Sequence, residues 1–221
     1  MVERIVVGVM NTNAYVLAIG KKECILVDPG GNAQEIIGRL KALNMFPLAI
    51  DCTHGHLDHT AAIPEIVDYY YSVEKEVPIA IHEADAAYLG KTARETHINT
   101  FKAIGAMDYF EEFYSPMPGP DIILKHGDTI CDTDFTVIHT PGHTKGSICL
   151  YSKESSALLT GDTLFFEGVG RTDLPESSPQ DLDKSISENL LHLSPETRVF
   201  PGHGPLSTLE RELKHNPFLH V

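Results

Sequence analysis

The sequence has no tryptophan, and only four of its 221 residues are cysteine. None of the four belongs to a Cys-x-x-Cys pair, and most lie in apolar, strand-like segments: Cys24, Cys52, Cys131 and Cys149. Cysteines of this kind are typical of buried free thiols in a reducing compartment. The distribution therefore predicts a cytoplasmic protein without a disulfide framework.

Positive charge is also scarce, because 17 Lys and Arg residues stand against 31 Asp and Glu residues, for a net charge of −14. This balance disfavours binding to nucleic acid or to an anionic membrane, and so argues against a nuclease. No apolar run reaches the length of a transmembrane helix. The first residues do not resemble a secretory signal, since Glu3 and Arg4 precede a short apolar run that Asn11 ends.

The length fits one α/β domain, and no repeat or low-complexity linker divides the chain. We therefore expect a single domain over residues 1–221. Between residues 83 and 120 the pattern weakens, and we expect a helical and loop insertion there that covers a cleft.

Alternating strands and helices in each half of the chain predict two sheets with helices outside them. Strands are expected at residues 5–9, 14–19, 24–27, 48–52, 78–81, 122–125, 129–131, 135–139, 147–151, 157–160 and 198–200. Helices are expected from residue 32 and over 61–71, 84–89, 100–113, 179–191 and 206–214.

Residues 53–59 are rich in side chains that bind metal ions. Imidazole and carboxylate groups are ligands for zinc and for other first-row cations. The stretch follows a predicted strand and precedes a predicted helix, so we expect a short loop. There His54 and His56 can reach one ion, while Asp58 and His59 turn toward a second position.

Two neighbours of these ligands have other expected roles. Gly55 leaves room for a backbone that folds closely around a cation. Cys52 lies on the opposite side of the strand from Thr53, so we do not expect it to be a ligand.

Three more metal-ligating residues, His143, Asp162 and His203, each follow a glycine at the end of a predicted strand. One such residue alone usually bonds to nearby backbone. Together with the first cluster they make seven ligands, enough for two ions bridged by one carboxylate.

The order of these motifs resembles the metallo-β-lactamase fold superfamily: His-x-His-x-Asp-His, Gly-His-Thr, Gly-Asp and Pro-Gly-His-Gly. The run Gly168–Pro175 and the ending with Glu210-Arg211 and Asn216-Pro217-Phe218 are similar to short, single-domain type II glyoxalases (hydroxyacylglutathione hydrolase-like proteins). The likeness extends from about residue 13 to the C-terminus and is weak over 83–120. It implies an α/β fold, an αββα sandwich of two mixed sheets with helices on both outer faces.

The resemblance also implies a binuclear centre of two divalent ions. It assigns His54, His56 and His143 to the first metal and Asp58, His59 and His203 to the second, with Asp162 bridging them. Zinc suits these ligands best, and iron or manganese would also bind.

Two adjacent cations lower the pKa of a shared water from about 15.7 to near 7. Asp58 would then be catalytic, because it accepts a hydrogen bond from the resulting hydroxide and orients it. A thiolate, with an ordinary pKa of about 8.5, leaves without a dedicated acid. We therefore expect hydrolysis of a small acyl thioester such as S-lactoylglutathione.

The sequence departs from the larger type II glyoxalases, which carry a C-terminal helical extension that contacts glutathione. Only about eighteen residues follow His203, and Lys145 replaces a proline that often follows Gly-His-Thr. The identity of the thiol in the thioester substrate therefore stays open. Lys145 and Arg171 are candidate substrate contacts, although Arg171 would serve equally as a brace between sheet and loop.

Two alternatives remain. A mononuclear iron persulfide dioxygenase of the same fold shares the Gly-Arg-Thr-Asp run, but His203 and the complete first cluster favour two metals. A non-catalytic, metal-stabilised module is less consistent with these ligands, because structural zinc sites are usually rich in cysteine. The acyl group and the oligomeric state stay open.

Overall fold

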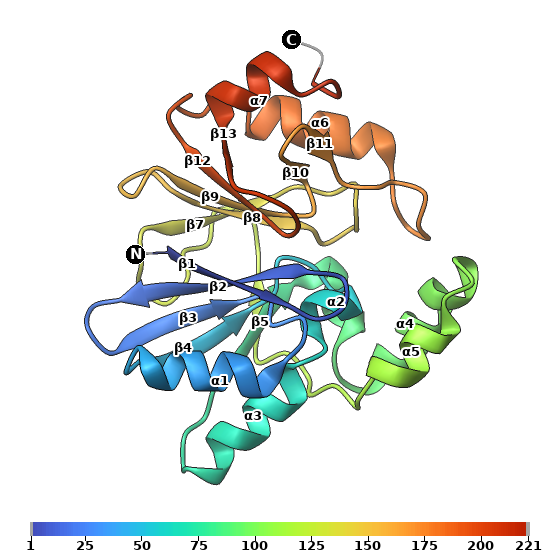
Figure 1. Ribbon diagram of the computed structural model, residues 1–221. Coiled ribbons are helices and arrows are strands. Elements are labelled where there is room, and N and C mark those ends of the chain that lie inside the picture. Colours follow the sequence, from blue (N-terminus) through green and yellow to red (C-terminus); the bar gives the residue numbers. More distant parts are fainter. Residues whose placement is uncertain (1, 220–221) are drawn as a thin grey trace.

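Two mixed β-sheets lie face to face, and helices cover both outer faces, in a computed structural model that describes residues 2–219 (Figure 1). The first sheet has the strand order β1-β2-β3-β4-β5-β6. Its first three strands are antiparallel, and β3 to β6 run parallel. The strands are β1 (Val2–Val7), β2 (Thr12–Ile19), β3 (Glu23–Val27), β4 (Phe46–Asp51), β5 (Ile79–His82) and β6 (Ile122–Leu124).

The second sheet has the order β13-β12-β9-β8-β7, in which β9 and β12 are parallel neighbours and the other pairs are antiparallel. Its strands are β7 (Phe135–His139), β8 (Ile148–Ser152), β9 (Ala157–Gly161), β12 (Arg198–Pro201) and β13 (Ser207–Thr208). A separate hairpin pairs β10 (Leu164–Phe165) with β11 (Gly168–Val169).

The helices form three groups. Those on the first sheet are α1 (Ala33–Ala42) and α3 (Ile63–Ser72), and those on the second are α6 (Pro179–Asn189) and α7 (Leu209–His215). A third group extends to one side of the sandwich (Figure 1): η1 (Glu83–Tyr88), η2 (Gly90–Thr92), α4 (Ala93–Ala103) and α5 (Met107–Phe113).

The inner strands are buried on both faces, because side chains alternate along a strand. In β3, Cys24 and Leu26 pack toward α1 and α3, whereas Ile25 and Val27 pack between the sheets. A third apolar cluster lies between the second sheet and α6. Three apolar layers thus hold the strand ends in fixed positions, and the predicted αββα sandwich is confirmed.

Several local predictions were wrong. Residues 129–131 form no strand: Thr129 makes an isolated bridge with Thr136, and the left-handed backbone at Cys131 (φ 44°) turns the chain. The single helix expected over 100–113 is two helices, α4 and α5, separated at Gly105, which has φ 69°. The loop expected over 53–59 ends in a helical turn, α2 (Leu57–Thr60).

Two composition-based predictions are also addressed by the structure. All four cysteines are free, but Cys131 is only partly buried, so the prediction of four buried thiols was wrong for that residue. Within residues 2–219, no helix has both the length and the apolar character needed to cross a bilayer.

Candidate metal centre

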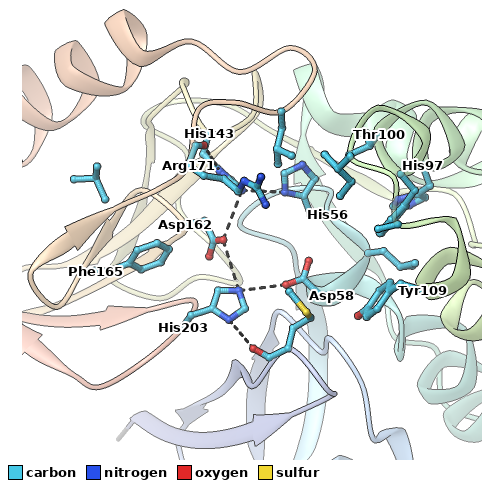
Figure 2. Close-up of a pocket in the computed structure, with 17 residues that line it drawn as sticks. His56, Asp58, His97, Thr100, Tyr109, His143, Asp162, Phe165, Arg171 and His203 are labelled. Carbon is cyan, nitrogen blue, oxygen red and sulfur yellow. Dashed lines mark hydrogen bonds and ion pairs between the residues drawn. The ribbon is translucent and has the colours of Figure 1, made fainter.

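All seven predicted ligands meet at one edge of the sandwich, where four strands end. Figure 2 shows five of them: His56, Asp58, His143, Asp162 and His203. His54 and His56 follow β4, and Asp58 and His59 lie in α2. The other three follow strands of the second sheet: His143 comes after β7, Asp162 after β9 and His203 after β12.

Backbone hydrogen bonds join the two sheets at this edge. The Ile148 N–H donates to the Thr53 carbonyl at 2.8 Å, and the Asn13 N–H donates to the Gly202 carbonyl at 2.7 Å. The loops that carry the ligands of the two sheets are therefore fixed to each other as well as to their own strands.

The first ligand group consists of three buried imidazoles, His54, His56 and His143, whose ring nitrogens lie within 4.8 Å of one another. The Nε2 atom of His143 is 2.9 Å from Nδ1 of His56. Burial and the neighbouring His143 lower the pKa of His56 to about 3, and burial with nearby histidines holds the pKa of His54 well below its usual value. The rings of His54 and His56 are thus neutral, as metal ligation requires.

The second ligand group consists of Asp58, His59 and His203. The Nε2 atom of His203 is 3.2 Å from Oδ2 of Asp58 and 3.2 Å from Nε2 of His59. Asp162 lies between the two groups: its Oδ1 is 3.4 Å from Nε2 of His59, and its Oδ2 is 3.6 Å from Nε2 of both His143 and His203.

Hydrogen bonds on the far side of the rings fix their tautomers. Nδ1 of His143 donates to the Arg171 carbonyl at 2.9 Å, and Nδ1 of His203 donates to the Met10 carbonyl at 3.2 Å. Because a carbonyl only accepts, each Nδ1 carries a proton, and Nε2 is the nitrogen of each ring that faces the other ligands.

Asp28 orients His59 in the same way, since its Oδ2 accepts from Nδ1 of that ring at 3.0 Å. The carboxylate also accepts from the backbone N–H of Thr53 at 2.7 Å and from its hydroxyl at 2.6 Å. Asp28 is therefore a support for His59 rather than a ligand, although it lies close to His54 and His59.

The buried polar atoms show that a cation fits here. Nε2 of His54 and Oδ1 of Asp162 are buried and have no hydrogen-bond partner among the described residues. Buried polar atoms normally have partners, and a set made of imidazole and carboxylate suits first-row divalent cations. Burial alone would raise the pKa of Asp162, but His59, His143 and His203 outweigh it and lower the pKa, so the carboxylate is anionic.

The role of Asp85, a buried residue of η1, could not be predicted from the sequence, because the residue belongs to none of the ligand motifs. Its Oδ2 accepts from the Gly55 N–H at 2.9 Å and from the Thr144 hydroxyl at 2.8 Å, and its Oδ1 accepts from the Gly146 N–H at 2.6 Å. This one carboxylate therefore holds the loop of His54 and His56 against the loop of His143.

The structure shows a reason for Gly55 that differs from the expected one. A Cβ atom there would lie 2.3 Å from the ring of Tyr88, a residue of η1. Glycine is required because this aromatic ring packs on the ligand loop.

A cleft of about 440 Å³ opens above the ligand cluster (Figure 2). His97 of α4 lines it and donates from Nε2 to the Tyr88 carbonyl at 3.2 Å. Burial lowers the pKa of His97 to about 4, so the ring is neutral.

Of the two candidate substrate contacts, Arg171 lines the cleft and its guanidinium binds Asp173, with Nε–Oδ1 at 2.7 Å and Nη2–Oδ2 at 2.8 Å. Lys145 pairs with Glu176 at 2.6 Å and lies outside the lining formed by the described residues. Substrate contact by Arg171 or Lys145 stays a prediction.

The model of the metallo-β-lactamase superfamily matches residues 7–203. A probable metallo-hydrolase of Streptococcus pyogenes is 34% identical over 94% of this chain and 85% of its own length. The hydroxyacylglutathione hydrolase GloC of Haemophilus influenzae is 30% identical over 99% of this chain and 97% of its own.

Solved structures show the same fold. BLEG-1, a B3 metallo-β-lactamase, is 35% identical with a TM-score of 0.86 over 100% of both chains. TTHA1623 in a di-iron-bound form is 32% identical with a TM-score of 0.82, over 98% of this chain and 100% of its own. ETHE1 from Myxococcus xanthus, at 21% identity and a TM-score of 0.72 over 98% of this chain and 83% of its own, shares the fold.

The chain therefore belongs to the metallo-β-lactamase superfamily. It is a metal-dependent enzyme of the metallo-hydrolase class, and its cluster of histidine and aspartate side chains is a centre for divalent metal.

Proposed function

We propose that this protein is a binuclear hydrolase that cleaves small acyl thioesters. The observation that carries the proposal is the position of Asp162 between two complete ligand groups at the floor of a cleft. In this proposal His54, His56 and His143 hold one ion, Asp58, His59 and His203 hold the other, and Asp162 contacts both. The similarity to a hydroxyacylglutathione hydrolase supports a thioester as substrate.

The seven ligands would hold two divalent cations, which would supply the nucleophile by lowering the pKa of a bound water to about 7. The carboxylate of Asp58 accepts a hydrogen bond from that nucleophile and directs it toward the carbonyl carbon of the substrate. A C–O bond forms and the C–S bond breaks. The sulfur leaves as a thiolate, which takes the remaining proton, so water and thioester give a carboxylic acid and a thiol.

The cleft favours a leaving group that needs no proton. Within the described lining, burial lowers the pKa of His97 to about 4, so this ring is neutral at neutral pH and its N–H is bonded to the Tyr88 carbonyl rather than available as an acid. Burial raises the pKa of Tyr109, which makes its hydroxyl a weaker acid. A thiolate leaves readily under these conditions, whereas the nitrogen of an amide must be protonated.

Opening of a β-lactam ring is the second candidate, and its basis is the full-length similarity to BLEG-1. The reaction uses the same attack on a carbonyl carbon but expels a nitrogen. Iron-dependent oxidation of a persulfide is the third, since iron occupies the centre of TTHA1623 and ETHE1 shares the fold.

One set of assays separates the three reactions. Zinc-loaded protein is incubated without oxygen with S-lactoylglutathione, with the lactoyl thioester of N-acetylcysteamine, and with a chromogenic cephalosporin, while iron-loaded protein receives glutathione persulfide under air. We expect thiol release from a thioester and elemental analysis close to two ions per chain. Absence of thiol release from both thioesters, with cephalosporin opening or oxygen uptake, would overturn the proposal.

A further inference from the structure

The wall of the cleft indicates which thiol the substrate carries, provided that the proposed thioester hydrolysis is correct. On the side of α4 and α5, Phe101 stacks on Tyr109 with ring centroids 5.5 Å apart, and Ile104 extends the same surface. Phe165 lines the opposite side, and Leu174 also lines the cleft. Figure 2 shows Tyr109 and Phe165 on opposite sides of the ligand cluster. A substrate that reaches the ions therefore passes between two apolar walls.

Charged substrates find little attraction at these walls. Among the lining residues that the structure describes, Arg171 is the one permanently charged cation. Both of its hydrogen bonds to Asp173 are charge-assisted and in parallel, so the guanidinium and the carboxylate form a neutral unit. The side chains of both residues are more than half exposed.

The chain as a whole repels anions, because its net charge is −14. Glutathione carries two carboxylates, and each would require a cation or several N–H donors on entering an apolar cleft. The nearest lysine in sequence to His143, Lys145, already pairs with Glu176.

We propose that the substrate is a thioester of an uncharged, largely apolar thiol, and that Asp173 sets this preference by neutralising Arg171. The apolar walls bind the thiol half by removing its surface from water. The acyl carbonyl then lies over the ligand cluster at the floor of the cleft.

The experiment compares two esters of the same acid, S-lactoylglutathione and the S-lactoyl ester of N-acetylcysteamine, on the zinc-loaded protein. We expect kcat/KM to be about tenfold higher for the neutral ester than for the glutathione ester, mainly through a lower KM. About tenfold is the effect of one charge-assisted hydrogen bond. Equal or better hydrolysis of the glutathione ester overturns the inference. Hydrolysis of neither ester overturns the proposed function instead, so the two failures are distinguishable.

A variant tests the role of the ion pair directly. Asp173→Asn frees the Arg171 guanidinium, and we expect the ratio of kcat/KM for the glutathione ester to that for the neutral ester to rise several-fold. Adding Arg171→Met should remove this gain, and the backbone carbonyl that orients His143 stays in place. Asp128→Asn is the control, because it removes one exposed negative charge and leaves the pairs of Arg171 with Asp173 and of Lys145 with Glu176 intact. An unchanged ratio in Asp173→Asn, or an equal rise in Asp128→Asn, contradicts the role given to Asp173.

Discussion

Asp162 and Asp58 are both aspartates of the metal centre, but they contact different sets of histidines. Asp162 lies 3.4 to 3.6 Å from ring nitrogens of His59, His143 and His203, and so touches both ligand groups. Asp58 lies near His59 and His203 alone, at 3.6 and 3.2 Å. The two residues are therefore expected to differ when each is replaced.

Replacing Asp162 with Ala should weaken both ions together, because it removes a contact from each group. Asp58→Asn should leave the ion of His54, His56 and His143 in place and lower turnover by roughly 10²- to 10⁴-fold. Elemental analysis of the purified variants, together with turnover of the metal-loaded proteins, checks both results. Equal metal loss in the two variants would show that these roles are wrong.

The sequence predicted the seven ligands because they lie in short, dense motifs. It missed Asp28 and Asp85, whose partners are far along the chain. Asp28 bonds to Thr53, 25 residues later, and Asp85 bonds to Gly146, 61 residues later. Asp28 precedes proline and two glycines, a pattern typical of a turn, and only the packing of separate strands shows what it supports.

Among the elements, η1 has a role beyond connecting β5 to α4. Tyr88 of this short helix packs on Gly55, and Asp85 bonds to the loops that carry His56 and His143. The segment expected to cover the cleft thus also fixes the geometry of the first ligand group.

Asp85→Asn should loosen that group, because an amide NH₂ replaces one of two oxygens that face three hydrogen-bond donors. We expect the affinity for the ion of His54, His56 and His143 to fall by roughly 10- to 100-fold, as for other residues that orient ligands, with the second ion little affected. Competition with a chelator measures the two dissociation constants. Asp128→Asn is the control, since this carboxylate accepts from the Lys125 N–H in an exposed turn. Equal weakening of both ions would contradict a role for Asp85 in one ligand group.

Among the helices and strands, the sequence predicted long elements better than short ones. The longer strands of both sheets and the helices on their faces have clear periodicity, and they were found. β10, β11 and β13 have two residues each, too few for any alternation to be recognised. The break at Gly105 was missed because the apolar pattern of α4 continues into α5.

In the whole molecule, one carboxyl group is buried between the two sheets without a partner. Asp51 of β4 pairs in register with Ala80 of the inter-sheet cluster, and neither of its oxygens has a hydrogen bond within residues 2–219. Burial, with a smaller effect from Asp28, raises the pKa of Asp51 to about 7. The group is therefore neutral in the folded protein at acidic pH.

This burial predicts a loss of stability at higher pH. In the unfolded chain the carboxyl ionises near pH 4, whereas in the folded protein it ionises only near pH 7. Stability is fully present below pH 4 and falls as the pH rises to 7, by about 4 kcal/mol in all. Asp51→Asn lacks this titration. The unfolding free energy of the variant minus that of the parent protein should therefore increase between pH 4 and 8. Urea unfolding of both metal-free proteins measures the difference, and a difference independent of pH would contradict the prediction.

The hydrogen bonds that join the two sheets at the ligand edge also determine when the centre can form. Asn13 of β2 donates from its side chain to the Pro201 carbonyl, a residue 188 positions later in the chain. Contacts that close so long a loop require nearly the whole chain and are costly in conformational entropy. A chain that has not yet placed the strands of its second sheet therefore lacks His143, Asp162 and His203, and with them half of the centre. The complete set of ligands arises in the final stage of folding, and a bound ion would act as a cross-link between the first and last parts of the chain.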